Sequence, residues 1–180
     1  MNYSLKAYFY AEINGLDKTF SWIRVLRKAF RGRQANYLFW WRIASRLHGS
    51  KIRLIKSIGK SINRRITRRH GIDIMMGAQI APGLNLGHML GVCITSGLVA
   101  GKNLNVRQNV QIGALREGEC KISIGDNVFV GTNSCILGTG LHIGDNVVIG
   151  AMSFVNQSIP DNATFVTEKV SRILVREEGA

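Results

Sequence analysis

Aliphatic residues recur at every sixth position through the middle of the chain. Seven consecutive positions at this spacing are aliphatic: Ile74, Ile80, Leu86, Val92, Leu98, Leu104 and Val110. An α-helix repeats every 3.6 residues and a strand every two, so neither element explains a six-residue period. A short strand followed by a corner does explain it, because each unit then points one aliphatic side chain inward. Three such units close a triangular coil, and stacked coils share a continuous core.

The six-residue period is interrupted after Val110 and then resumes. Residues 113–121 have a polar composition and are predicted to protrude from the coils as a loop. The period returns in the units IGDNVF, VGTNSC, IGDNVV and IGAMSF, which begin at Ile124, Val130, Ile143 and Ile149. Glycine or Asp-Asn would occupy the corners, where a positive φ is tolerated. We therefore predict an all-β helix of parallel strands over 71–160, followed by a C-terminal tail over 161–180.

The first 70 residues follow a helical pattern instead. Ile55, Ile58, Ile62 and Ile66 are spaced three or four residues apart, which places them on one face of a helix. Two earlier apolar stretches, 22–30 and 37–47, are followed by Gly32 and Gly49, and glycine commonly ends helices. The sequence therefore predicts an N-terminal helical segment over 1–70.

Most of the positive charge lies in this helical segment. The chain has a formal net charge of +13, and residues 1–69 hold 17 of its 24 Lys and Arg but only 2 of its 11 acidic residues. Basic amphipathic helices with aromatic residues can lie on anionic membranes, and the same charge could bind nucleic acid. The apolar faces could also simply pack, leaving the charges solvated. Since no recognised nucleic-acid motif is present, we favour peripheral membrane contact through 20–69 and expect no nucleic-acid partner.

Composition excludes several other classes of protein. The three cysteines (Cys93, Cys120 and Cys135) form no CxxC pair and have no histidines at metal-ligand spacing, so we expect neither a disulfide scaffold nor a metal site. The N-terminus lacks the pattern of a signal peptide. Residues 74–101 lack charge but include six glycines and a proline, which argues against a membrane-spanning helix. We expect a cytoplasmic protein.

Five stretches of the β-helical region carry a resemblance to a known family. They are LNLGHMLGVCITSG, NVRQNVQIG, IGDNVFVGTNSCILG, IGDNVVIGAMSF and the closing VNQSIPDNATFVTEKVSRIL. Over roughly its last 100 residues the chain resembles the hexapeptide-repeat acyltransferases of the serine-acetyltransferase-like branch, and within them the colanic-acid and capsule type of exopolysaccharide O-acetyltransferase. The resemblance implies a left-handed β-helix, a homotrimer, acetyl-coenzyme A as donor, and active sites in the clefts between neighbouring prisms.

The resemblance implies that His88 is the catalytic residue. Its imidazole would take the proton from an acceptor hydroxyl that attacks the thioester, and would return that proton to the leaving thiolate, with no covalent enzyme intermediate. An unperturbed imidazole pKa of about 6.5 suits general-base catalysis near neutral pH. The resemblance also places an oxyanion-stabilising backbone N–H near Gly113. His142, His48 and His70 lack such a motif and are expected to be structural or to lie at helix ends.

The same resemblance suggests how coenzyme A would bind. The small residues Gly131, Thr132, Gly150 and Ala151 match the family's positions along the pantetheine arm, and each could equally be an ordinary corner residue. Lys169 and Arg172 match the basic positions that suit the nucleotide phosphates.

Two departures from the serine acetyltransferase pattern bear on the acceptor. Serine acetyltransferases place an Asp immediately before the catalytic His, and this chain has Gly87 there. They carry a second His at the end of the loop, where this chain has Cys120-Lys121-Ile122. Because these groups would hold an amino acid, we expect a sugar hydroxyl of a capsular or exopolysaccharide, or of its precursor, as acceptor. The alternatives are a serine acetyltransferase variant and a non-catalytic trimeric scaffold whose basic arm binds a membrane or polyanion.

Overall fold

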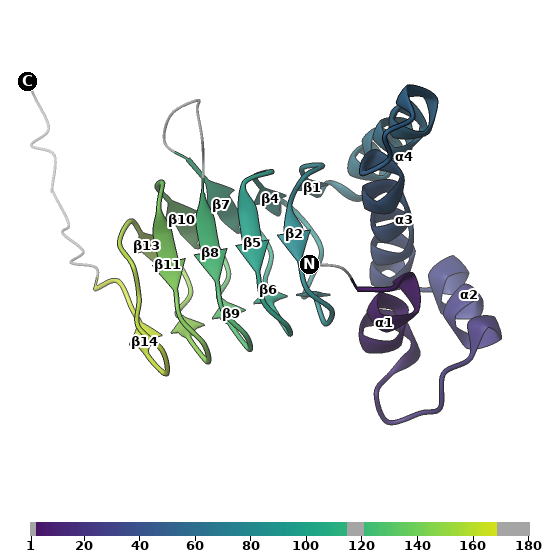
Figure 1. Ribbon diagram of the computed structural model, residues 1–180. Helices are drawn as coiled ribbons and strands as arrows, with labels where there is room; N and C mark the ends of the chain where they lie inside the picture. Colours follow the sequence, from purple (N-terminus) through teal and green to yellow (C-terminus); the bar gives the residue numbers. More distant parts are fainter. Residues whose placement is uncertain (1–2, 115–120, 169–180) are drawn as a thin grey trace, which may run out of the picture.

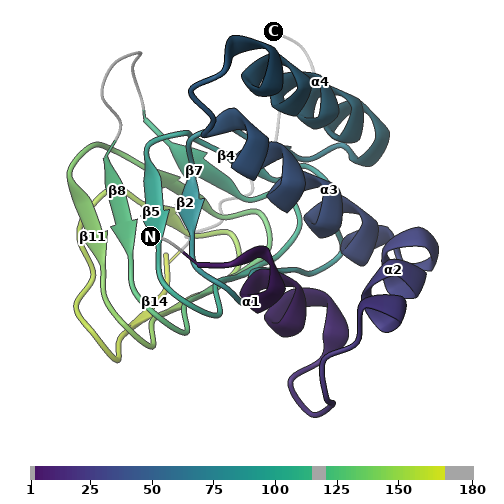
Figure 2. The same cartoon turned by 45° about the vertical axis from the view of Figure 1, so that its right-hand side comes forward.

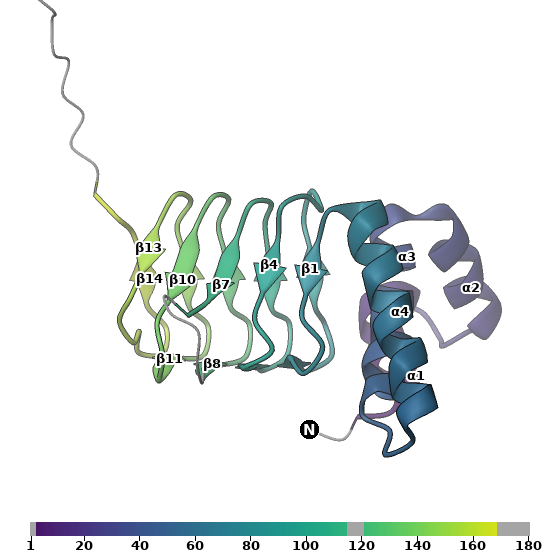
Figure 3. The same cartoon turned by 90° about the horizontal axis from the view of Figure 1, so that it is seen from above.

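The computed structural model describes residues 3–114 and 121–168, which form a group of helices followed by a β-helix (Figure 1). The helices are α1 (Leu5–Phe9), the π-helix η1 (Tyr10–Asn14), α2 (Trp22–Arg31), α3 (Arg33–His48) and α4 (Arg53–His70). All of them stand at the end of the β-helix where its first coil lies, as the view from above shows (Figure 3). The predicted fold class, N-terminal helices followed by a parallel β-helix, is confirmed.

The strands form three parallel sheets, one on each side of a triangular prism (Figures 1 and 2). The first side contains β1 (Asp73–Ile74), β4 (Cys93–Ile94), β7 (Gln111–Gly113), β10 (Cys135–Leu137) and β13 (Phe154–Val155). The second contains β2 (Gln79–Ile80), β5 (Leu98–Ala100), β8 (Ile122–Ile124) and β11 (Leu141–Ile143). The third contains β3 (Asn85–Leu86), β6 (Asn105–Val106), β9 (Phe129–Val130), β12 (Val148–Ile149) and β14 (Thr164–Phe165). The segment 74–101 thus forms short strands, as its glycines and proline predict.

The core of the prism is a column of aliphatic side chains. Most strands contribute an inward aliphatic pair two residues apart, such as Val92 with Ile94 or Leu104 with Val106. In β10 and β13 the first inward residue is a buried serine, Ser134 or Ser153. All seven residues of the sequence period before the loop are at most 2% exposed. This burial confirms that the period marks the core. Removal of this apolar surface from water is the main favourable term for the β-helix.

Asparagines line the prism edge between the second and third sides. The four residues have left-handed φ angles of 56–58°: Asn103, Asn127, Asn146 and Asn162. Their side-chain amides form a ladder, each donating to the next at 2.9–3.0 Å. An aspartate precedes each of the last three asparagines and accepts a backbone N–H group from the coil before, for example Asp145 from Asp126 at 2.6 Å. The predicted role of Asp-Asn at the corners is therefore confirmed.

The helices are longer and packed differently than the sequence pattern predicts. Helices α2, α3 and α4 cover the three predicted apolar stretches, whereas α1 and η1 were not predicted. On α4, Ile66 is buried but Ile58 is 47% exposed. The reason is Gly59, where a Cβ would lie 2.7 Å from the carbonyl oxygen of Ala44 on α3. The close approach of the two helices centres the buried face on Gly59 instead of Ile58. Within the described ranges, none of the helices has the length and apolarity to cross a bilayer.

Candidate active site

His88 lies on one edge of the prism, which we call the His88 edge. This edge consists of the corners that join the third side to the first: residues 87–92, 107–110, 131–134 and 150–153. The corners stack through backbone bonds, in which Gly87 donates to the carbonyl of Val106 at 2.9 Å and Gly131 donates to that of Ile149 at 2.8 Å. Residues at the start of successive corners are therefore one coil apart.

The first corner of the His88 edge is two residues longer than the others. Eight residues separate the inward Leu86 of β3 from the inward Ile94 of β4, whereas six separate Ile94 from Ala100 of β5. Asn109 donates its backbone N–H to Leu90, so the stacking resumes at Leu90 and the two extra residues are His88 and Met89.

This insertion turns the imidazole outward. Met89 is buried, His88 is exposed, and His88 adopts a left-handed φ of 53°. Such a φ is uncommon for a residue other than glycine and marks a constrained position. Among the described residues, no group hydrogen-bonds the imidazole. An exposed imidazole of this kind is accessible to a hydroxyl group, which is one condition that a general base must meet.

The four residues predicted to line the coenzyme A arm lie on the His88 edge. Thr132 is two coils beyond His88, and its hydroxyl donates to Oε1 of Gln108 at 3.2 Å. Gly150 and Ala151 are one coil further along, and Ala151 is exposed. Gly131 is buried, and a Cβ there would lie 2.5 Å from the backbone nitrogen of Ala151. The stacking of the coils is therefore enough to require glycine at position 131.

A Cβ at Gly150 would have more room than one at Gly131. Its nearest neighbour would be the carbonyl oxygen of Phe165, at 3.4 Å. Coil stacking thus explains the glycine at 131, but it does not by itself require the glycine at 150. The two basic residues predicted to bind the phosphates, Lys169 and Arg172, lie outside the described residues.

Gly113 is not beside His88 in this chain. It ends β7, in register with Leu137 of β10, at the edge between the first and second sides of the prism. His88 precedes β4, at the opposite end of the first side. One chain therefore does not bring the predicted base and the predicted oxyanion donor together.

The remaining histidines and cysteines have other surroundings. His142 is hydrogen-bonded to Ser123 at 3.0 Å on the second side, and His48 and His70 are the last residues of α3 and α4. Partial burial and the charge of Asp73 raise the pKa of the Cys93 thiol, which disfavours the thiolate that a nucleophile needs. Cys120 lies outside the described residues.

Arg107, in the corner one coil beyond Gly87, was not among the predicted site residues. Its guanidinium lies over the ring of Phe129, 5.3 Å from the ring centroid. The only available signal was its place in NVRQNVQIG, directly after the inward Val106. A sequence pattern predicts a solvated corner residue here, because Phe129, whose ring it contacts, is 22 residues away in the sequence.

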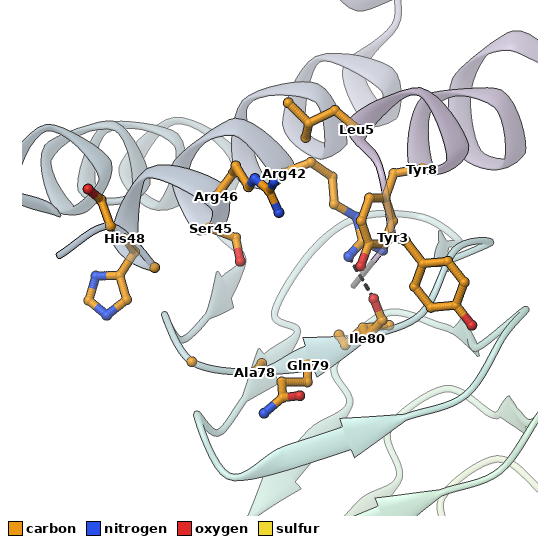
Figure 4. A pocket seen from close by; sticks show the side chains of 13 residues that line it. Tyr3, Leu5, Tyr8, Arg42, Ser45, Arg46, His48, Ala78, Gln79 and Ile80 are labelled. Atoms are coloured by element: carbon orange, nitrogen blue, oxygen red, sulfur yellow. Dashed lines mark hydrogen bonds between the residues drawn. The ribbon is translucent and has the colours of Figure 1, made fainter. Parts of the chain in front are cut away.

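A cavity of about 500 Å³ lies between α1, α3 and the β2 region (Figure 4). Tyr8, Arg42 and Arg46 project into it from the helices, and Gln79 borders it from the first coil. Arg42 donates there to the carbonyl of Ile80 at 2.8 Å. None of the predicted site residues lines this cavity.

Comparison with known proteins supports the branch named by the resemblance. Residues 121–157 match the family model described as "Hexapeptide repeat of succinyl-transferase". The serine acetyltransferase of Staphylococcus aureus strain Mu50 is 35% identical over 139 residues, which cover 76% of this chain and 62% of that protein. The serine acetyltransferase of Staphylococcus epidermidis strain ATCC 12228 is 38% identical over 111 residues, which cover 61% of this chain and 51% of that protein.

Solved structures give the same result. Serine acetyltransferase isoform 3 of Entamoeba histolytica, in complex with cysteine, has a TM-score of 0.70 and 28% identity, covering 84% of this chain and 54% of that chain. The serine acetyltransferase of Neisseria gonorrhoeae, in complex with serine, has a TM-score of 0.68 and 29% identity, covering 78% of this chain and 56% of that chain. The chain spans about half the length of these relatives.

These relatives are named serine acetyltransferases, so the comparisons favour that branch and do not support the narrower expectation of a capsule O-acetyltransferase. The chain therefore has the fold of the hexapeptide-repeat acyltransferases and is similar in sequence and structure to serine acetyltransferases.

Proposed function

We propose that the chain is an acetyltransferase that moves an acetyl group from acetyl-coenzyme A to a hydroxyl group, with His88 as general base. The observation that carries this proposal is the two-residue insertion that exposes the imidazole at the first corner of a prism edge. The similarity to serine acetyltransferases supports the same reaction class.

The His88 edge offers a path for the donor. Beyond His88 the edge presents Thr132 and the exposed Ala151, which are small enough to let an extended pantetheine arm lie against the corners. We propose that Gly150 and Ala151 contact this arm and that Lys169 and Arg172 bind the phosphates at its far end. The donor would then place its thioester near His88.

His88 would act on the acceptor hydroxyl in two proton transfers. The imidazole accepts the hydroxyl proton while the oxygen attacks the thioester carbonyl, and a tetrahedral oxyanion forms. As that intermediate collapses, the carbon–sulfur bond breaks and the imidazolium returns the proton to the thiolate. The products are an O-acetyl ester and free coenzyme A. No covalent bond to the protein forms at any point.

We propose a homotrimer as the active form. Gly113 and His88 occupy different edges of one prism, so a backbone donor near Gly113 could assist only across a contact between two chains. A cleft between neighbouring prisms would bring the two edges together, as the resemblance implies.

The comparisons favour serine as the acceptor, ahead of the sugar that the sequence departures suggest. The names of the relatives, and the serine bound to the Neisseria gonorrhoeae protein, support this choice. A sugar hydroxyl is the second candidate, because Gly87 supplies no carboxylate to hold the ammonium group of an amino acid.

A thiol-release assay tests the proposed function. Acetyl-coenzyme A is offered with L-serine, with neutral and acidic sugars, and with L-alanine as a control that lacks the hydroxyl. We expect coenzyme A release with L-serine and none above background with L-alanine. Absence of release with every hydroxyl acceptor, together with no binding of acetyl-coenzyme A by calorimetry, would favour the scaffold alternative.

We also propose that α2 rests on an anionic membrane surface. Its exposed apolar residues include Ile23 and Phe30, at 80% and 73% exposure. Four basic residues share the helix: Arg24, Arg27, Lys28 and Arg31. An apolar face flanked by cations suits the interface between lipid headgroups and acyl chains.

A further inference from the structure

The guanidinium of Arg107 occupies the space beside the residue that precedes His88. A Cβ at Gly87 would lie 2.5 Å from Nη1 of Arg107 and 2.9 Å from its Cδ. Arg107 thus reaches back along the His88 edge by one coil and covers the backbone of position 87. Glycine at position 87 leaves that space to the guanidinium.

Two contacts hold Arg107 in this place. Its backbone N–H donates to the carbonyl of Val130 at 3.0 Å, and its guanidinium lies over the ring of Phe129. The side chain is half-buried. An arginine that is stacked on an aromatic ring loses less freedom when it binds an anion, because its planar fork is already oriented.

No carboxylate neutralises this guanidinium within the described part of the chain. The ion pair found there joins Glu12 to Arg42, at the helical end of the protein. A half-buried cation without an acidic partner, placed next to a candidate catalytic base, is suited to bind an anionic group of a ligand.

We propose that Arg107 binds a carboxylate of the acceptor and so orients the acceptor hydroxyl toward His88. This proposal rests on the proposed function and deepens it. Arginine and carboxylate form paired, parallel N–H···O bonds, which fix both the position and the direction of the bound group. Arg107 is therefore a specificity-determining residue for acidic acceptors, whether the carboxylate belongs to an amino acid or to an acidic sugar.

The place of Arg107 argues against a role in binding the donor's phosphates. Successive coils are about 4.8 Å apart, and Arg107 is one coil from Gly87. The phosphates of coenzyme A are separated from the thioester by the whole pantetheine arm. A donor whose thioester lies near His88 would therefore carry its phosphates past several coils, well beyond Arg107.

Matched acceptor pairs test this proposal. Each pair differs only in the carboxylate: L-serine against L-serinamide, and glucuronic acid against glucose. We expect the wild-type protein to use the acidic member of its preferred pair with a kcat/KM at least about tenfold higher, as expected for loss of one charge-assisted pair. Arg107→Gln should remove this preference by raising the KM of the acidic acceptor. The KM of acetyl-coenzyme A should not change.

Three further variants test whether the preference depends on the geometry and the position of the Arg107 guanidinium. Arg107→Lys keeps the charge but not the fork, so it should retain only part of the preference. Gly87→Asp places a carboxylate against the guanidinium and should weaken glucuronic acid as Arg107→Gln does, because that acceptor has no ammonium group for the new carboxylate to hold. Lys102→Gln changes an exposed cation on another edge and should leave the preference intact. Thermal unfolding of each variant shows whether it is folded.

The possible failures are distinguishable. If Arg107→Gln keeps the preference for the acidic acceptor, or if it raises the KM of acetyl-coenzyme A instead, the role assigned to Arg107 is wrong while the proposed function stands. If the wild-type protein releases no thiol with any acceptor, the proposed function itself fails.

Discussion

Glu12 and Arg42 form a buried ion pair that joins the N-terminal helices to the first coil of the β-helix. The side chains of both residues are at most 4% exposed. Arg42 also donates to the carbonyls of Ile80 and Ala81 at 2.8 and 3.2 Å. Glu12 accepts the backbone N–H groups of Gly83 and Leu84. The pair thus satisfies backbone groups at the open end of the prism, where no earlier coil can do so.

We expect Glu12→Ala to destabilise the protein by about 3–5 kcal/mol, because it leaves the Arg42 guanidinium buried without its counter-ion. Glu12→Gln keeps a hydrogen-bond acceptor and should cost less. Urea unfolding measures both changes, with the exposed Glu168→Gln as control. Equal stability of Glu12→Ala and wild type would show that the pair does not hold the helices to the coil.

His70 should make the stability depend on pH. Burial, reinforced by the charges of Arg69 and Arg33, lowers the pKa of His70 below its ordinary value. Its ring is hydrogen-bonded to Asn36 at 3.1 Å and meets the edge of Tyr37. Below pH of about 6.5 the unfolded chain takes up a proton that the folded protein resists.

The free energy of unfolding should therefore fall as pH decreases from about 7 toward 5. His70→Gln, which cannot titrate, should show a smaller decrease over the same range. Urea unfolding of both proteins at several pH values gives the comparison. Titratable groups that both proteins share cancel in the difference between their free energies of unfolding. Parallel pH profiles of the two proteins would show that His70 does not cause the decrease.

The two glycines of the His88 edge should respond differently to alanine. At Gly131 a Cβ would meet the backbone of the next coil at 2.5 Å, so Gly131→Ala should lower stability by about 1–3 kcal/mol. At Gly150 the corresponding distance is 3.4 Å, and Gly150→Ala should change stability by less than about 1 kcal/mol. Instead, Gly150→Ala should weaken acetyl-coenzyme A binding in calorimetry. Equal losses of stability would contradict this division of roles.

The membrane proposal predicts that the full-length chain floats with vesicles containing phosphatidylserine. The double variant Ile23→Ser with Phe30→Ser should remain in the lower fraction, because it removes the most exposed apolar side chains of α2. Val99→Ser, an exposed apolar position on β5, serves as the matched control and should float. Flotation of the α2 variant, or no flotation of the unaltered chain, would contradict the proposal.

The sequence period predicts the core well but hides the feature that places the site. Leu86 and Val92 are both buried and six residues apart, so the six-residue period passes through His88 without a visible break. In the structure, Leu86 is the second residue of its buried pair, whereas Val92 is the first residue of the next pair. The residue equivalent to Leu86 is therefore Ile94. Since the strands on both sides of this corner each bury two residues spaced by two, an insertion of two residues leaves the six-residue spacing intact. The spacing of one aliphatic residue per unit therefore cannot reveal such an insertion.

Contacts between residues far apart in the sequence could not be predicted either. Arg107 meets Gly87 across twenty positions, and Glu12 meets Leu84 across seventy-two. Both contacts depend on which backbone groups the stacked coils and the helices leave open. Side-chain patterns along the chain carry no record of that geometry, and the candidate base His88 came from the family resemblance and not from the pattern.

The most direct test of the account is coenzyme A release by His88→Ala. We predict that this variant binds acetyl-coenzyme A as the wild type does in calorimetry but releases thiol about 10²–10⁴-fold more slowly with the same acceptor. His142→Ala, whose histidine lies on the second side of the prism, should keep the wild-type rate. Wild-type thiol release by a folded His88→Ala protein would contradict the central claim.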